Sequence, residues 1–106
     1  MKVHQFRRHN RLNDENRQNL AWIRQQITKQ RVAFVSAELN AGTNFCQAAL
    51  STSNADRKTR NIENAVNGYK TLRCFSDVLR ALRNNRTFQQ RLGRFKDLLH
   101  ELGQEV

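Results

Sequence analysis

Residues 32–54 read VAFVSAELNAGTNFCQAALSTSN, and the organisation of the chain can be worked out from this stretch. Apolar residues recur through it at helical spacing on two sides, so we expect it to be the most buried segment. Its last four residues, 51–54, are small polar residues that end the pattern. The stretch therefore predicts the buried end of a helix followed by a turn.

The same helix is predicted to begin far upstream, because Asn13-Asp14-Glu15 offers a capping side chain and two acids where the helix dipole is positive. An apolar stripe keeps its helical phase from there: it comprises Leu20, Ile23, Ile27, Phe34, Ala41, Phe45 and Ala48. We predict one continuous helix from about 14 to 51. The alternative is a break within residues 40–44, where Gly42 could end one helix before another begins.

Two further helices follow. Ser53 with Asp56 resembles a capping box and predicts a helix from about 55 to 83. Thr87 with Gln90 is a second such pair, and it predicts a final helix that ends at Gly103. The fold class is therefore all-α: an up-down helical bundle of three to four helices. We expect a flexible basic N-terminal arm over residues 1–12 and a single domain over residues 13–106.

The composition of the 106-residue chain agrees with this fold, since it contains no proline and only four glycines. The N-terminus lacks the apolar core of a secretory signal, and no stretch approaches the roughly 20 apolar residues of a membrane span. A cytoplasmic location is the expectation. The two cysteines are accordingly expected to be reduced thiols.

Charge is the most unusual property. Nineteen basic residues, fourteen of them arginine, stand against nine acidic ones and leave a net charge of +10. Arginine presents a planar fork of donors that fits phosphate or carboxylate, so this composition favours a polyanionic partner. The alternative is a charged surface that serves only solubility.

The positive charge is concentrated in residues 1–31 and 55–86, each of which contains eight basic residues. We predict that nucleic acid, DNA or RNA, binds there through ten side chains: Arg7, Arg8, Arg11, Arg17, Arg24, Arg31, Arg57, Lys58, Arg60 and Arg73. The alternative is an adapter or inhibitor that docks on an acidic protein surface, with Trp22 as an apolar anchor. A helix-turn-helix over 34–50 is a weaker candidate, because Glu38 stands where a small residue is usual.

No enzyme, cofactor or metal site is expected. If residues 46 and 74 lie on two arms of a helical hairpin, they are roughly 20 Å apart along the helix axes. Cys46 and Cys74 are thus predicted to be buried free thiols. No two histidines have the i, i+4 spacing of a helical metal site. Glu38 is a lone carboxylate and is predicted to be partly exposed or paired with an arginine.

The lengths of the predicted helices suggest self-association. A helix of about 38 residues is roughly 57 Å long, whereas the last helix covers only about 24 Å. Apolar side chains in the overhanging part would lie in water: these are Leu20, Ile23 and Ile27, with Trp22 nearby. We therefore predict a homodimer joined through residues 16–34. The alternative is a break near Gly42 or Gln30 that lets the first segment fold back over its own core.

Overall fold

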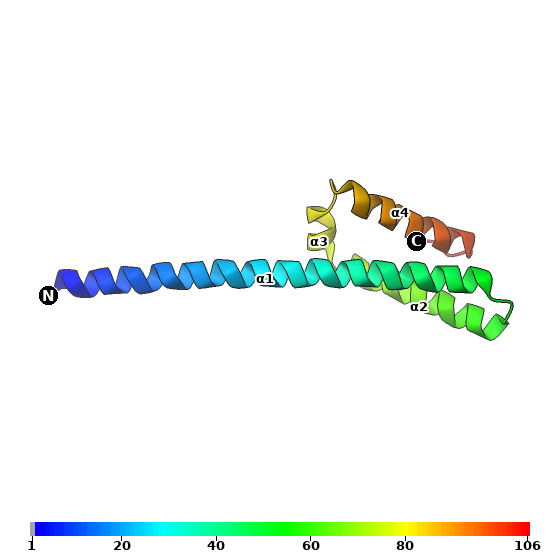
Figure 1. Ribbon diagram of the computed structural model, residues 1–106, viewed down its shortest axis with the longest axis horizontal. Helices are drawn as coiled ribbons and strands as arrows, with labels where there is room; N and C mark the ends of the chain where they lie inside the picture. Colours follow the sequence, from blue (N-terminus) through cyan, green and yellow to red (C-terminus); the bar gives the residue numbers. More distant parts are fainter. Residues whose placement is uncertain (1) are drawn as a thin grey trace. The chain divides into compact units, whose positions relative to one another are not determined.

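The computed structural model describes the backbone of residues 2–106 and the side chains of residues 14–106. It contains α1 (Lys2–Ser51), α2 (Ala55–Arg73), α3 (Ser76–Ala81) and α4 (Arg86–Glu101), as Figure 1 shows. No strand occurs in residues 2–106. The all-α prediction is therefore confirmed, with four helices. The predicted basic arm lies outside the residues whose side chains are described.

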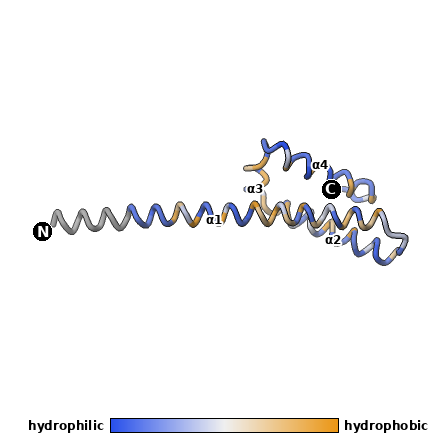
Figure 2. Tube along the Cα trace, in the orientation of Figure 1, coloured by the Kyte–Doolittle hydropathy of each residue, from blue (hydrophilic) through white to orange (hydrophobic). Residues whose placement is uncertain are grey.

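The chain divides into two compact units, residues 1–30 and residues 31–106. In the first unit, the side chains from Asp14 to Gln30 are exposed, except that Gln26 is half-buried. Along this part of α1, hydrophilic stretches are interrupted by short hydrophobic patches (Figure 2). The second unit contains the remainder of α1 with α2, α3 and α4, and it holds the hydrophobic core.

Contacts within the second unit show the direction of each helix. Gly68 of α2 lies against Gly42 of α1, and the Phe75 ring just beyond α2 lies 5.1 Å from the Phe34 ring. Residue numbers thus rise along α2 as they fall along α1, so the two helices are antiparallel. In contrast, Arg91 of α4 contacts Ser36, and Phe95 further along α4 contacts Gly42. This end of α1 and α4 therefore run in the same direction.

Gly42 does not break α1. It lies inside the helix, and the ring of Phe95 occupies the space that a side chain at this position would fill. A Cβ at position 42 would lie 2.8 Å from Cε2 and 2.9 Å from Cε1 of that ring. A Cβ at Gly68 would come within 4.0 Å of the Gly42 Cα. The prediction of one continuous helix is confirmed. The glycine serves close packing rather than termination.

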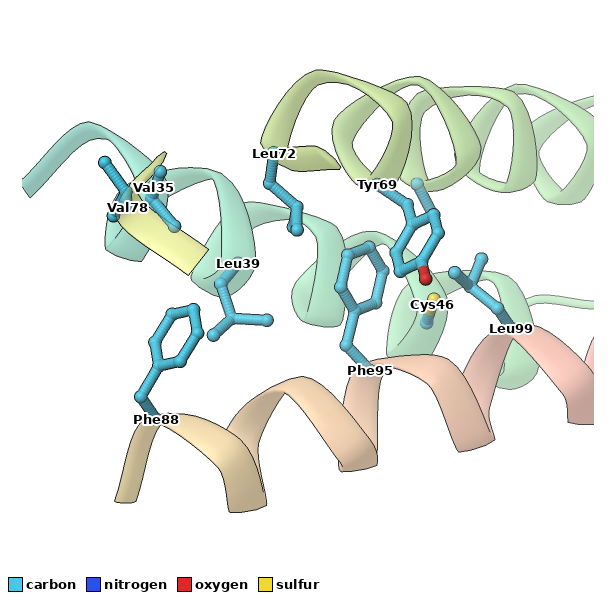
Figure 3. Close-up of a cluster of buried hydrophobic side chains, with 10 residues drawn as sticks. Val35, Leu39, Cys46, Tyr69, Leu72, Val78, Phe88, Phe95 and Leu99 are labelled. Atoms are coloured by element: carbon cyan, nitrogen blue, oxygen red, sulfur yellow. The ribbon is translucent and has the colours of Figure 1, made fainter. Parts of the chain in front are cut away.

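The core is formed by all four helices (Figure 3). Phe88, Phe95 and Leu99 point from α4 toward α1 and α2, where the edge of the Tyr69 ring meets Phe95 at a centroid distance of 5.8 Å. The fully buried side chains of α1 include Val35, Leu39 and Cys46, with Tyr69 and Leu72 opposite them on α2 and Val78 on α3.

The two apolar sides expected in residues 32–54 are buried to different extents in the second unit. Phe34 is 44% exposed and Ala48 is exposed, whereas Val35, Leu39 and Cys46, on the neighbouring side of the helix, are buried. Periodicity locates an apolar face but does not say which of two adjacent apolar faces a partner helix will cover. Which of the two apolar faces of α1 is buried depends on where α2 and α4 pack against it.

The predicted helix over 55–83 is interrupted. α2 ends at Arg73, and Phe75 has a non-helical backbone with φ −92° and ψ 54° before α3 begins at Ser76. Leu72 and Val78 would point in directions about 120° apart on one straight helix. The turn lets both side chains enter the same core, where they are 0% and 3% exposed.

The predicted capping residues are wrong by one or two positions. Asn54, not Ser53, caps α2, because its Oδ1 accepts a 3.0 Å hydrogen bond from the Arg57 N–H. Likewise Asn85, not Thr87, caps α4 by accepting from the Phe88 N–H at 3.0 Å. Asparagine is at least as favourable at the N-cap as serine or threonine, so the sequence alone did not distinguish Asn54 from Ser53 or Asn85 from Thr87. The C-cap of α4 is Leu102, one residue before the predicted Gly103, which follows it with a positive φ of 78°.

Candidate nucleic-acid interface

Two arginines and two amides gather on the outer face of α2. Arg57, Arg60, Asn61 and Asn64 line a surface hollow of about 220 Å³, which we call the α2 hollow. Their spacing of three and four residues places them on one side of the helix. Arg57, Arg60 and Asn64 are exposed, and Asn61 is half-buried. The face therefore presents guanidinium forks beside amides that can donate to, or accept from, a ligand.

The cations of the α2 hollow have no acidic partner. Among residues 14–106 the only ion pair joins Arg31 to Asp77. In addition, Arg57 and Arg60 lie near the N-terminus of α2, where the helix dipole is itself positive. Asp56 lies in the same first turn but forms no ion pair with either arginine. Two unpaired guanidinium groups at the positive end of a helix are an electrostatic condition that favours an anionic ligand.

The other two predicted contacts on α2 lie outside the hollow. Lys58 and Arg73 are exposed. Arg73 stands in the last turn of α2 together with Lys70, where a cation is favoured by the negative end of the helix dipole. Stabilisation of the helix end is thus sufficient to account for Arg73.

In the first unit, Arg17 and Arg24 are exposed and lie seven residues apart on one side of α1. Arg7, Arg8 and Arg11 lie outside the residues whose side chains are described. The predicted contacts whose side chains are described are therefore divided between the two units.

Arg31 is engaged inside the second unit. Its Nε donates to Asp77 Oδ2 at 3.1 Å and its Nη2 donates to Oδ1 at 2.7 Å, so the pair is bidentate. The guanidinium carbon also lies 4.8 Å from the centroid of the Phe75 ring. The hydrogen bond from Arg31 lowers the pKa of the Asp77 carboxyl. Among the predicted contacts within residues 14–106, this arginine alone has its charge neutralised by an ion pair.

Asn61 and Asn64 interleave with the basic residues in the sequence as amides that can bond a nucleic acid, but they were not among the ten predicted contacts. Sequence reasoning missed Asp77, because it is 46 residues from Arg31 and only the turn at Phe75 brings α3 to it. Arg91 has a structural role: its Nη2 donates to the Ser36 carbonyl at 3.5 Å and to Asn40 Oδ1.

A larger hollow of about 480 Å³ follows α4, but its lining contains charges of both signs, including Arg94, Asp97 and Glu101. It therefore does not concentrate positive potential as the α2 hollow does.

No group of three or more His, Cys, Asp or Glu side chains within residues 14–106 is arranged to hold a metal ion. The continuity of α1 also removes the turn that a helix-turn-helix over 34–50 requires.

The two cysteines differ in their exposure to solvent. Cys46 is a buried free thiol, as predicted, and burial raises its pKa to about 11. Cys74 is free but exposed, so the prediction of a buried thiol is wrong there. It caps the C-terminal end of α2, and its Sγ donates to the Lys70 carbonyl at 3.3 Å.

Glu38 is half-buried beside Gly68, as expected for a partly exposed carboxylate.

Within the described residues, no helix contains a stretch long and apolar enough to cross a membrane. Comparison of the chain with known protein families, with curated proteins and with solved structures gave no match. The fold and the arrangement of charged side chains are therefore the only basis for assigning a function.

Proposed function

We propose that this protein is a small, non-enzymatic nucleic-acid-binding protein that contacts the phosphate backbone through arginine-rich helix faces. One observation carries the proposal: the exposed arginines of the α2 hollow have no carboxylate partner among residues 14–106, although they lie at the positive end of a helix. Bringing a phosphate to these side chains would reduce the repulsion between the two guanidinium groups.

The chemistry of the face suits a backbone ligand. A guanidinium can hold two phosphate oxygens at once, which makes Arg57 and Arg60 the expected anchors. Asn61 and Asn64 can bond phosphate, sugar or base edges beside them. Arg17 and Arg24 would add phosphate contacts from the first unit. The ligand is DNA or RNA.

A fluorescence polarisation titration tests the proposal against duplex DNA, single-stranded DNA and RNA at two salt concentrations. The double variant Arg57→Gln/Arg60→Gln should weaken binding and reduce the slope of log K against log salt by about two. The matched control is Arg83→Gln/Arg86→Gln, which removes the same charge from exposed positions outside the hollow. Equal losses in both variants would show that only total charge matters, and absence of binding at low salt would end the proposal.

The alternative function, an adapter or inhibitor that docks on an acidic protein surface, is favoured by one observation. Trp22 is 61% exposed, and an exposed tryptophan near arginines is a frequent interface anchor. In that case a stoichiometric protein partner should remain bound after nuclease treatment and should be lost with Trp22→Ala. Nucleic-acid binding through the α2 hollow should instead be unaffected by that substitution.

A further inference from the structure

Three large apolar side chains are exposed along one line of α1 in the first unit. Leu20 is 52% exposed, Ile23 44% and Ile27 48%. Their spacing of three and then four residues is that of successive a, d and a positions in a coiled coil. Asn16 and Gln30 continue the same line as polar d positions at its two ends. We call these five residues the α1 seam.

The two edges of the α1 seam differ chemically. Arg17 and Arg24 occupy one edge, at positions e, whereas Asn19 and Gln26 occupy the other, at positions g. All but the half-buried Gln26 are exposed. Neither arginine has an acidic partner within residues 14–106. A helix that pairs with the seam must therefore bring a neutral or acceptor group against the arginine edge.

We propose that the α1 seam pairs with the seam of a second copy of this chain, in parallel orientation and in register. In a parallel pair, position e of one helix faces position g of the other, so Arg24 meets the Asn19 amide of its partner, whose carbonyl oxygen can accept a hydrogen bond. In an antiparallel pair, e faces e, and two Arg24 guanidinium groups would lie side by side. The cost of like charges selects the parallel arrangement.

The polar residues of the seam favour the same register. In a parallel, in-register pair each Asn16 meets Asn16 and each Gln30 meets Gln30, so the amides can satisfy one another within the interface. A shift in register by one heptad would place the amides of Asn16 and Gln30 against Ile23. A single buried amide is known to set register in coiled coils at some cost in stability.

The interface would be short, because only three apolar side chains per chain contribute to it. A stable protein interface buries about 1,200–2,000 Å², which the seam alone does not reach. We therefore expect a reversible dimer that forms with rising concentration rather than an obligate one. The proposal does not depend on which polyanion the protein binds.

Sedimentation equilibrium tests the association over chain concentrations from about 5 to about 300 µM. The wild-type mass should rise from 12.5 kDa toward twice that value. Ile23→Glu should hold the mass at 12.5 kDa throughout. Because Ile23 is exposed and lies outside the core, this variant should keep its helical content and melting temperature at low concentration.

Trp22→Gln is the matched control. Trp22 is more exposed than its neighbour Ile23, but on α1 it points away from the seam. This variant should associate as the wild type does. A wild-type mass that stays at 12.5 kDa over the whole range would overturn the proposal, as would equal loss of association in both variants.

Disulfide cross-linking tests the orientation. In a Cys74→Ser background the remaining native thiol, Cys46, is buried and unreactive. Gln30→Cys should then form a homodimeric disulfide under mild oxidation, because position 30 meets its own copy only in a parallel, in-register pair. An antiparallel pair centred on Ile23 would instead join Asn16→Cys to Gln30→Cys in a mixture of the two variants. Preferential formation of that mixed product would refute the parallel arrangement.

Discussion

Gly42→Ala is the sharpest test of the packing described above. The new Cβ would lie 2.8 Å from Cε2 and 2.9 Å from Cε1 of Phe95, a ring that is itself fully buried. The ring or the backbone must move to accommodate it, and overpacking of this kind costs about 1–3 kcal/mol. Alanine favours a helix interior over glycine by about 1 kcal/mol, which opposes the loss. We expect a net decrease in the free energy of unfolding of up to about 2 kcal/mol.

Thermal and urea unfolding followed by far-UV circular dichroism would measure this change. For a domain of this size, about 1 kcal/mol corresponds to a shift of roughly 4–8 °C in melting temperature. Gly93→Ala is the control, since Gly93 lies inside α4 and a Cβ added there would meet no atom within 4 Å. That variant should gain about 0.5–1 kcal/mol from helix propensity.

The contact with Phe95 can be isolated further by a double-mutant cycle. Phe95→Leu removes the ring that the new methyl group meets, so Gly42→Ala should cost less in that background than in the wild type. The reasoning would be refuted if Gly42→Ala gained as much stability as Gly93→Ala, or if its effect were the same with and without the ring.

Three further predictions concern single side chains of the second unit. The pKa of Asp77 is lowered in the folded state, so its contribution to stability is present above the unfolded pKa and is lost as the pH falls through the folded pKa. Asp77→Asn should therefore unfold more easily than the wild type at neutral pH, and the difference should disappear in acid-range melting curves. A thiol reagent followed by mass spectrometry should label one cysteine, Cys74, in the native protein and both after denaturation, because Cys46 is buried with a pKa of about 11. Asn54→Ala should lower the free energy of unfolding by about 1 kcal/mol in urea titrations, whereas Ser53→Ala should leave it nearly unchanged.

The helices themselves could be predicted because their signals are local. Periodic apolar residues and the polar turn at 51–54 were enough to place the end of α1 and the course of α2 and α4. The break at Phe75 was not predictable in this way, since no residue there opposes a helix. It arises because Leu72 and Val78 both gain burial when the chain turns.

Much of the candidate site was equally visible in the sequence. Arg57 and Arg60 stand out from the charge pattern, and helical spacing places them on one face of α2. The state of Arg31 was not visible, because its charge is neutralised by a carboxylate that lies far away along the chain. Sequence alone shows where cations are, but their availability depends on tertiary contacts.

The bidentate pair between Arg31 and Asp77 has a consequence for competition among anions. Asp77 is tethered beside the guanidinium, so it acts as an intramolecular ligand whose effective concentration is in the millimolar range or above. A free phosphate ion at micromolar concentration cannot displace it. A ligand that does displace it must itself be held close by other contacts, so Arg31 can distinguish a dense, tethered array of anions from the same anions free in solution.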